Sequence, residues 1–506
     1  MRNLTIILSL LISCSSYAQV TGTEFIVHYN ENQINSVLSS FGIPSNLVSA
    51  IYEVDFYRVT YMTMHPNGEM VEVSGALCVP SDANCPLPIS SYQHGTIGSR
   101  GEAPSFVSGE AMLGVIFASG GYITCMPDYI GLGQSELLHL YVHADSEASA
   151  SLDMIRATRD LQEELGFEWN EELFLWGYSQ GGHATAALQR LIELDESNEF
   201  QITGSAPMSG PYDISGAQAS VITADQIYPT PGYLPYVVLS YQEVYGNIFT
   251  DLEEIFLPEY AAIIPDLFDG THNMGYINSQ FPDIPNQMLQ PNLLEQFQSD
   301  PNHPLRVALA ANDVMDWAPQ VPTQLFFCEG DDQVNYMNSL NAYDAFQNLG
   351  STSVLLSDFG DYDHGECAPI AILAGYYFFE SLRTPVFNPQ VSAVVEGISD
   401  VGLGFVFVNV VFPQGDYTFE WSNGWEELDL EAFEPGEYTL TLTDDAGCSQ
   451  SYTYTIEYDL SVPNLNESQS IKLFPNPASD LVQVQLNKTE KIMIYDVSGR
   501  LLFTQK

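Results

Sequence analysis

A serine set among glycines, where an apolar strand passes into a helix, constrains the fold of this chain more than any other feature. The segment Leu173–Trp176 has the composition of a short buried strand, and His183–Leu194 has helical spacing. Residues 177–182 between them read G-Y-S-Q-G-G. Glycines are needed because so sharp a turn strains the serine backbone and leaves its neighbours no room for a Cβ. The pattern predicts a nucleophile elbow centred on Ser179, with the N–H groups of the new helix directed at an oxygen that becomes negative.

Strand-like and helical segments alternate around this turn, from about residue 50 to 210, and resume near residue 324. Such alternation predicts an α/β fold with a mostly parallel sheet. The further expected strands are 71–80, 87–92, 121–126, 324–328 and 353–357, and the further expected helices are 111–118, 149–165, 338–349 and 368–381.

The stretch from about residue 213 to 312 interrupts the alternation. It is rich in Tyr, Phe and Pro, and its apolar helical pieces are short. A hundred residues are too many for a plain loop, so we expect a mainly helical insertion that caps the upper edge of the sheet. The α/β domain as a whole is expected to span residues 19–388.

The texture changes again after residue 388. Residues 389–460 hold short strands separated by turn signals, which predicts a small β-sandwich domain. Residues 461–470 form a polar linker, and the remainder of the segment 461–506 holds two or three further short strands.

The charge balance narrows the classes of partner. The 506 residues include 65 Asp and Glu against 13 Lys and Arg, a formal net charge of −52. A surface of that sign repels phosphate groups, which argues against binding to nucleic acid or to anionic lipid. The excess of acid also suggests an extracellular habitat.

The first 18 residues have the pattern of an export signal. Arg2 supplies the positive end, Leu4–Ile12 the apolar stretch and Ser16–Ala18 a small-x-small cleavage site. A lipobox ending at Cys14 is the alternative, and would make that cysteine a lipidated N-terminus. The sequence after this signal contains no run of 18 apolar residues, so no transmembrane segment is predicted.

A serine hydroxyl needs a base, and the base needs an orienting acid. His364 is the expected base because it follows the strand 353–357 on a loop before the final helix. His183 lies one turn into the elbow helix and cannot reach back to the serine, while His272 and His303 fall within the expected cap.

The acid should follow the strand 324–328, where Asp331 and Asp332 compete. The oxyanion hole needs two backbone N–H groups, which we expect from Gln180, directly after the nucleophile, and from Thr96, after an early strand. His94 precedes the elbow in the chain, and we expect it to brace the Thr96 loop rather than to titrate.

Residues ~50–385 resemble the α/β-hydrolase superfamily, in its secreted lipase and esterase branch with a helical cap. The resemblance implies carboxylic-ester hydrolysis by a Ser-His-Asp acyl-enzyme mechanism, with no cofactor. The family habit of D-x-x-V selects Asp331 over Asp332, although Cys328 replaces the Gly usually found three residues before the acid. The resemblance is carried by the elbow together with Gln93–Thr96, Pro127–Gly133, Asn312–Pro319, the Asp331 loop and His364-Gly365.

Two C-terminal segments resemble other families. Residues 415–424 and 435–444 are similar to the adhesin-type repeats of gliding Bacteroidota. Residues 473–478 and 494–500 are similar to the C-terminal sorting domain of the type IX secretion system. The second resemblance implies that the type IX machinery is a partner and that the protein is secreted or held at the cell surface, which favours the simple signal over the lipobox.

Export also permits disulfides. Cys328 lies three residues before Asp331 and Cys367 three after His364, so a working triad would bring the two thiols together. We therefore predict a Cys328–Cys367 bridge. Cys78 and Cys85 bracket a short loop and could form a second bridge, Cys125 is expected to be a buried thiol, and no cysteine or histidine spacing suggests zinc.

Three functions are consistent with these patterns. The first is a secreted serine esterase or lipase acting on a small-molecule or lipid ester, with Tyr and Phe of the cap lining an apolar pocket. The second is a serine peptidase on the same fold, although no motif supplies anchors for peptide termini. The third is a non-catalytic cell-surface adhesin, which a complete triad argues against.

Overall fold

The computed structural model describes residues 19–458, except 45–46, 49, 82, 399–401, 412–415 and 445–446, and beyond them residues 472–474, 483–485, 492–495 and 501–505. The expected signal peptide, with Cys14 of the lipobox alternative, lies outside these residues. None of the helices in the described ranges is long and apolar enough to span a membrane. The chain divides into two compact units: one takes in everything up to Asn388 with residues 414–417 and 443–450, and the other takes in the rest.

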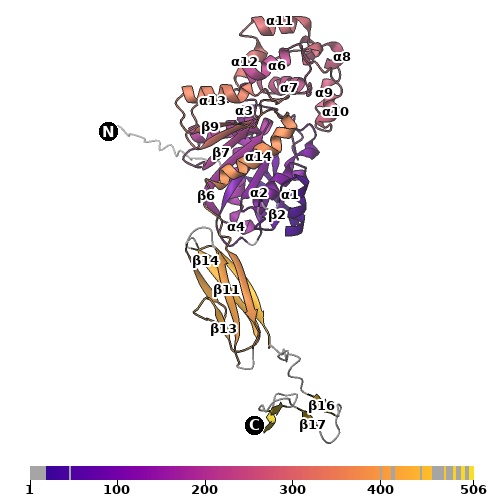
Figure 1. Ribbon diagram of the computed structural model, residues 1–506. Coiled ribbons are helices and arrows are strands. Elements are labelled where there is room, and N and C mark those ends of the chain that lie inside the picture. The colour runs from indigo at the N-terminus through magenta and orange to yellow at the C-terminus, as the bar shows by residue number, and fades with distance from the viewer. Residues whose placement is uncertain are drawn as a thin grey trace, which may run out of the picture. The chain divides into compact units, whose positions relative to one another are not determined.

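A nine-stranded sheet forms the centre of the first unit, in the order β1-β2-β3-β5-β4-β6-β7-β8-β9 (Figure 1). Strands β4 to β9 run parallel, while β1, β2 and β3 pair antiparallel and β3 joins the parallel part through β5. This confirms the predicted mostly parallel sheet. The bounds are β1 Val20–Tyr29, β2 Val54–Met64, β3 Met70–Pro80, β4 Leu87–Gln93, β5 Ile123–Pro127, β6 Trp169–Tyr178, β7 Gly204–Met208, β8 Thr323–Phe327 and β9 Val354–Asp358.

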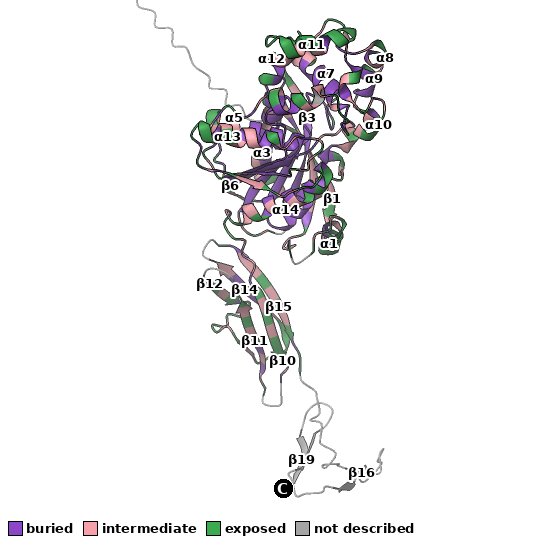
Figure 2. Ribbon diagram, turned by 45° about the horizontal axis from the view of Figure 1, so that its top comes forward, coloured by how far each residue is buried: buried purple, intermediate pink, exposed green. Residues whose placement is uncertain are grey.

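Helices cover both faces of this sheet, and each face has its own apolar core. Helices α3 (Ala144–Asp160), α5 (Gln180–Asp195) and α13 (Met337–Asn348) pack on one face. Helices α1 (Glu31–Ser40), α2 (Ala111–Ser119) and α14 (His364–Glu380) pack on the other. The short helix α4 (Gln162–Leu165) follows α3. Because helices cover both faces, β4, β5 and the second half of β6 are buried, and the strands of the central sheet are accordingly coloured as buried in Figure 2.

The chain between β7 and β8, which we call the cap, is largely helical and has an apolar core of its own. Several of its prolines stand at the first turn of a helix, where the missing N–H costs nothing, so they begin helices rather than break them. The helices are α6 (Ala219–Thr223), α7 (Tyr233–Tyr245), α8 (Pro258–Ala261), α9 (Ile264–Leu267), α10 (Met274–Asn278), α11 (Pro291–Ser299) and α12 (Pro304–Ala310).

The two ends of the cap meet at the edge of the sheet. Val314 N donates to the carbonyl oxygen of Tyr212 over 3.1 Å. Ser215, near the entry, donates through its backbone N and its hydroxyl to the carboxylate of Asp313, near the exit, over 2.9 and 2.6 Å. These bonds join the entry of the cap to its exit.

The second unit is built of short antiparallel strands, with Leu440 and Leu442 of β14 buried. Two three-stranded sheets have the orders β10-β11-β13 and β12-β14-β15, and the tail holds the pairs β16-β17 and β18-β19. The bounds are β10 Gln390–Glu396, β11 Gly404–Val411, β12 Tyr417–Trp421, β13 Leu430–Ala432, β14 Gly436–Asp444, β15 Ser449–Ile456, β16 Lys472–Phe474, β17 Gln483–Gln485, β18 Ile492–Tyr495 and β19 Leu501–Gln505.

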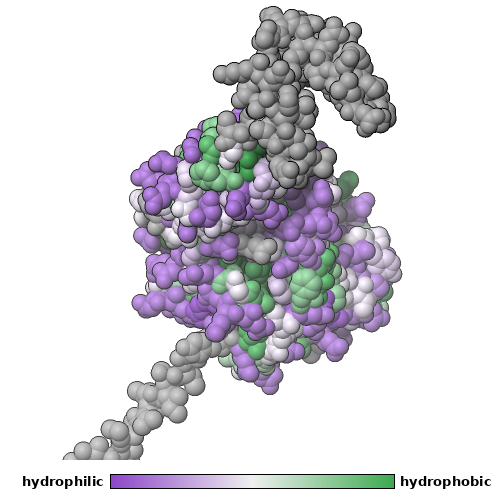
Figure 3. All heavy atoms as spheres, turned by 90° about the horizontal axis from the view of Figure 1, so that it is seen from below, coloured by the Kyte–Doolittle hydropathy of each residue, from purple (hydrophilic) through white to green (hydrophobic). Residues whose placement is uncertain are grey.

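The exposed side chains are mostly hydrophilic on the face that Figure 3 draws. Hydrophobic residues appear there in scattered patches. A hydrophilic surface is expected of a chain in which 65 acidic residues stand against 13 basic ones.

Two expectations need correction. The final helix begins at His364 rather than near residue 368, because the Asp363 side chain caps it by accepting a hydrogen bond from Glu366 N at 2.8 Å. The suggested Cys78–Cys85 bridge is wrong, since both thiols are free. Cys78 belongs to the core on one face of the sheet and Cys85 packs against the core on the other. The expectation that Cys125 is a buried thiol is confirmed.

Candidate active site

Ser179 occupies a strained turn between β6 and α5. Its φ of 63° and ψ of −124° lie where side-chain-bearing residues are rare, at a cost of roughly 1–3 kcal/mol. Ser179 N donates to the carbonyl oxygen of Met208 over 3.0 Å, which ties the turn to β7. A Cβ on Gly181 would overlap the carbonyl of Gln93 at the end of β4. The glycines of the pattern therefore let the helix approach the sheet closely enough to present the serine.

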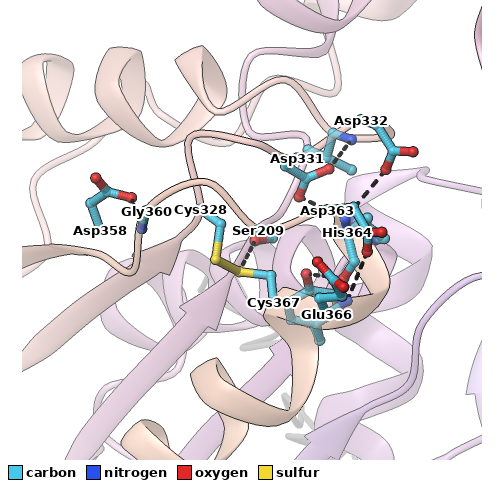
Figure 4. The surroundings of a disulfide bond; sticks show 12 residues. Ser209, Cys328, Asp331, Asp332, Asp358, Gly360, Asp363, His364, Glu366 and Cys367 are labelled. Carbon is cyan, nitrogen blue, oxygen red and sulfur yellow. Dashed lines mark hydrogen bonds and ion pairs between the residues drawn. A yellow bond between two sulfur atoms is a disulfide. The ribbon is translucent and has the colours of Figure 1, made fainter.

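An imidazole and a carboxylate face each other beside this turn. His364 Nδ1 lies 2.7 Å from Asp331 Oδ2, and both side chains are almost wholly buried. The other oxygen of Asp331 accepts the backbone N–H groups of Gln333 and Val334 at 3.0 and 2.8 Å. Asp332 is less buried and instead accepts the backbone N–H of His364, at 3.3 Å (Figure 4). The structure thus places Asp331, and not its neighbour, against the ring.

Ser179 and His364 line the same cavity. With Nδ1 donating to Asp331, Nε2 is the ring nitrogen left to receive a proton. No hydrogen bond joins the serine hydroxyl to this nitrogen within the described ranges. Bonds of this kind are often long before a substrate binds, so the arrangement is that of a resting site.

The segments that carry the acid and the base are joined covalently. Cys328, which follows β8, and Cys367, in the first turns of α14, form a disulfide with a Cα–Cα distance of 6.1 Å (Figure 4). The predicted bridge is confirmed. Tyr178 adds a second restraint, because its hydroxyl donates to the carbonyl oxygen of His364 over 2.6 Å. Asp331 therefore holds the imidazole, while Tyr178 and the disulfide hold the backbone that carries it.

Two backbone N–H groups near the serine have no hydrogen-bond acceptor among the residues that the structure describes. They belong to Gln180, the first residue of α5, and to Thr96, on the loop after β4. Both were expected at an oxyanion hole. His94 is buried on the same loop, with Nδ1 2.7 Å from the carbonyl oxygen of Gly95 and Nε2 3.3 Å from that of Asp128. It makes no hydrogen bond to the Asp331–His364 pair and holds the loop instead.

A buried polar network that the sequence analysis missed lies beneath the elbow. The Gln180 side-chain amide donates to Glu147 over 2.7 Å and lies 2.9 Å from Nε2 of His139. Burial lowers the pKa of His139 to about 3, so this ring is neutral and accepts the hydrogen bond. Glu147 also pairs with His183 at 2.8 Å, which accounts for that histidine as an internal residue. In the sequence, the only indication of this network is the position of Glu147, just before the expected helix 149–165.

The two histidines expected in the cap have local roles. His303 caps α12 by accepting from Leu305 N at 3.3 Å, and His272 stacks on Tyr276. No group of acidic, histidine or cysteine side chains in the described ranges could hold a metal ion.

Two cavities of different character meet at Ser179. One extends under the cap and has walls almost entirely of aliphatic and aromatic side chains. The other is larger and is lined also by His364, Thr96, Glu110 and Gln333. The aliphatic residues of the first include Ile214, Leu234, Val237, Leu289, Leu293 and Leu309.

Comparisons with known proteins identify the families of two parts of the chain. Residues 106–370 match the profile of the secretory lipase family, and residues 472–506 match that of the secretion system C-terminal sorting domain. The search of curated proteins gave no match.

The search of solved structures gave esterases, hydrolases and lipases. The rice cell wall degrading esterase LipA from Xanthomonas oryzae is 30% identical, with a TM-score of 0.65 over 73% of this chain and 100% of that one. A hydrolase from Legionella pneumophila is 28% identical, with a TM-score of 0.67 over the same shares. Candida antarctica lipase A, 16% identical over 73% of this chain and 84% of that one, has a TM-score of 0.55 and shares the fold.

Proposed function

Since this chain belongs to the secretory lipase family and is a secreted carboxylic-ester hydrolase, we propose that Ser179, His364 and Asp331 carry out the hydrolysis. The observation that supports this most is the 2.7 Å contact between His364 Nδ1 and Asp331, in a cavity that a strained elbow serine also lines. Burial of both side chains, beside a cavity that Ser179 and His364 both line, favours a catalytic role over a structural one.

The reaction follows from these positions. Ser179 Oγ attacks the ester carbonyl while His364 Nε2 takes its proton, and Asp331 holds the ring and stabilises the imidazolium. The backbone N–H groups of Thr96 and Gln180 bind the oxyanion. His364 then passes the proton to the leaving alcohol, and a water molecule activated by the same nitrogen releases the acid from the acyl-enzyme.

The two cavities divide the substrate between them. The leaving alcohol must lie on the side of His364, because that ring protonates it, and His364 lines only the larger cavity. The acyl group then enters the apolar cavity under the cap. Such a cavity, with walls of leucine, isoleucine and valine, suits an alkyl acyl chain rather than a peptide. This argues for lipid-like esters and against the peptidase alternative.

The test is the rate of p-nitrophenyl acetate, butyrate and palmitate hydrolysis beside a dipeptide anilide. Ser179→Ala should lower kcat for esters by about 10^4 to 10^6, since the nucleophile is lost. Folding should be preserved because removal of one hydroxyl leaves no large cavity. A variant that kept a tenth of the activity would refute the assignment, and a preference for the anilide would favour the peptidase.

The tail has its own test. We propose that the type IX machinery recognises the sorting domain matched at residues 472–506. A chain that ends before residue 472, expressed in a host with this system, should fold, keep its esterase activity and stay in the periplasm. Release of the shortened protein at the normal level would contradict the proposal.

A further inference from the structure

The candidate oxyanion loop is held by a carboxylate from a separate part of the chain. Glu110, the residue before α2, accepts the backbone N–H of Gly95 on Oε2 at 2.9 Å. The same oxygen accepts the hydroxyl of Tyr92, at 2.8 Å. Glu110 therefore joins the end of β4 to the loop that follows it.

The opposite side of Gly95 is also fixed. Its carbonyl oxygen lies 2.7 Å from His94 Nδ1, so both hydrogen-bonding groups of this glycine are engaged by side chains. A Cβ at Gly95 would stand 3.3 Å from Glu110 Oε1 and 3.5 Å from the carbonyl oxygen of Tyr178, so a side chain there would crowd the contact.

This arrangement determines the direction of the next N–H. The peptide that joins Gly95 to Thr96 is planar and trans, so the N–H of Thr96 points opposite to the carbonyl of Gly95. Fixing Gly95 at its N–H and at its carbonyl therefore fixes the Thr96 N–H, which has no hydrogen-bond acceptor among the described residues. The hydroxyl of Thr96, 3.1 Å from Tyr141 Oη, holds the side chain apart from it.

We propose that Glu110 is a positioning residue for the reaction: by its reach to Gly95 it holds the Thr96 N–H in the direction that the oxyanion needs. The inference rests on the proposed function, in which Thr96 is an oxyanion donor. In this proposal Glu110 acts through the length of its side chain, which lets it reach Gly95, and not through its negative charge. A charge beside the oxyanion would in itself oppose the reaction, so only the hydrogen bond explains a carboxylate at this place.

Three substitutions separate reach from charge. Glu110→Gln keeps an oxygen at the same distance and removes the charge, and should leave kcat within about threefold of wild type. Glu110→Asp keeps the charge and withdraws the oxygens by one methylene, and Glu110→Ala removes them. Both should lower kcat about 10- to 100-fold, below the roughly 10^2–10^3 typical of a lost oxyanion donor, while KM changes less than about twofold.

Glu102→Ala is the matched control. That side chain accepts the backbone N–H of Ser99 at 3.2 Å, on the same segment of chain but away from Gly95, so kcat should not change. The affinity for an alkyl boronic acid, which mimics the tetrahedral oxyanion, should fall in parallel with kcat for Glu110→Asp and Glu110→Ala. A purely structural role would lower the melting temperature without this parallel.

The results distinguish the inference from the proposed function. If Glu110→Gln loses as much activity as Glu110→Ala, or Glu110→Asp keeps wild-type kcat, the positioning role is wrong. If Glu110→Ala does not fold, the Gln and Asp variants still decide. Wild-type protein that fails to hydrolyse any ester, or that reacts with a phosphonate at a residue other than Ser179, would overturn the proposed function instead.

Discussion

Removal of the Cys328–Cys367 disulfide should lower the stability of the fold strongly and the activity only slightly. The bridge joins residues 39 positions apart, so it excludes many conformations of the unfolded chain. The chain-entropy relation gives about 4 kcal/mol for a loop of this length, an upper figure because the unfolded chain keeps some structure. Both cysteines are fully buried, so replacement by alanine also leaves small voids.

The catalytic loss should be smaller. The hydrogen bonds from His364 to Asp331 and from Tyr178 to the His364 carbonyl remain when the sulfurs are gone. They hold the ring in place while the protein is folded, so kcat at room temperature should fall by less than about tenfold. Inactivation on heating should nevertheless begin at a distinctly lower temperature.

The assay is urea unfolding of wild type and of Cys328→Ala/Cys367→Ala, each with and without a reductant, followed by tryptophan fluorescence and by residual ester hydrolysis. We expect the double variant to lose about 2–4 kcal/mol. Reductant should destabilise the wild type but not the double variant. Cys85→Ser, which removes a free thiol and keeps the bridge, should respond as wild type does. Equal unfolding midpoints for wild type and double variant would refute the reasoning, as would a reductant effect that persists without the two cysteines.

Three further changes test the site and its surroundings. Asp331→Asn should lower kcat about 10^4-fold and Asp332→Asn less than about fivefold, and the opposite ranking in p-nitrophenyl butyrate hydrolysis would move the acid by one residue. Leu293→Trp should lower turnover of palmitate relative to acetate more than about tenfold, because Leu293 lines the apolar cavity, whereas Val307→Trp, on an exposed position of the cap, should leave the ratio unchanged. The pKa of His139 falls from 6.5 to about 3 on folding, so the folded protein binds fewer protons than the unfolded chain between these values, and stability should drop as pH falls through that window by up to about 1.4 kcal/mol per unit. His139→Gln should flatten the change of the urea midpoint across the upper part of this window, and an unchanged slope would contradict the burial argument.

The pattern of apolar residues along the sequence was enough to predict the elements that are completely buried. The segment Leu173–Trp176 before the elbow is apolar and fully buried because helices cover both faces of the sheet. A short run of that kind next to glycines is typical of a buried strand that enters a tight turn. His364 and the Asp331 loop were expected because each follows a strand of the parallel sheet, and the carboxyl ends of such strands meet at one edge.

The sequence did not predict elements whose structure depends on contacts with distant parts of the chain. Strand β7 contains Gly204 and Pro207, which argue against a strand, and it is identified only by its pairing with β6 and β8 on either side. Glu110 and Glu147 escaped notice for a similar reason. Their partners lie 15 and 33 residues away in sequence, at Gly95 and Gln180, and only the folded sheet brings them together.

The meeting of the two ends of the cap has a bearing on how such enzymes diversify. Tyr212 lies shortly after β7 and Val314 shortly before β8, and a backbone hydrogen bond of 3.1 Å joins them. An insertion with adjoining ends can be exchanged between chains by recombination without pulling apart the strands on either side. The aliphatic walls would travel with the insert, while Ser179 and His364 would stay with the recipient. Substrate range and reaction chemistry can therefore be inherited from different parents.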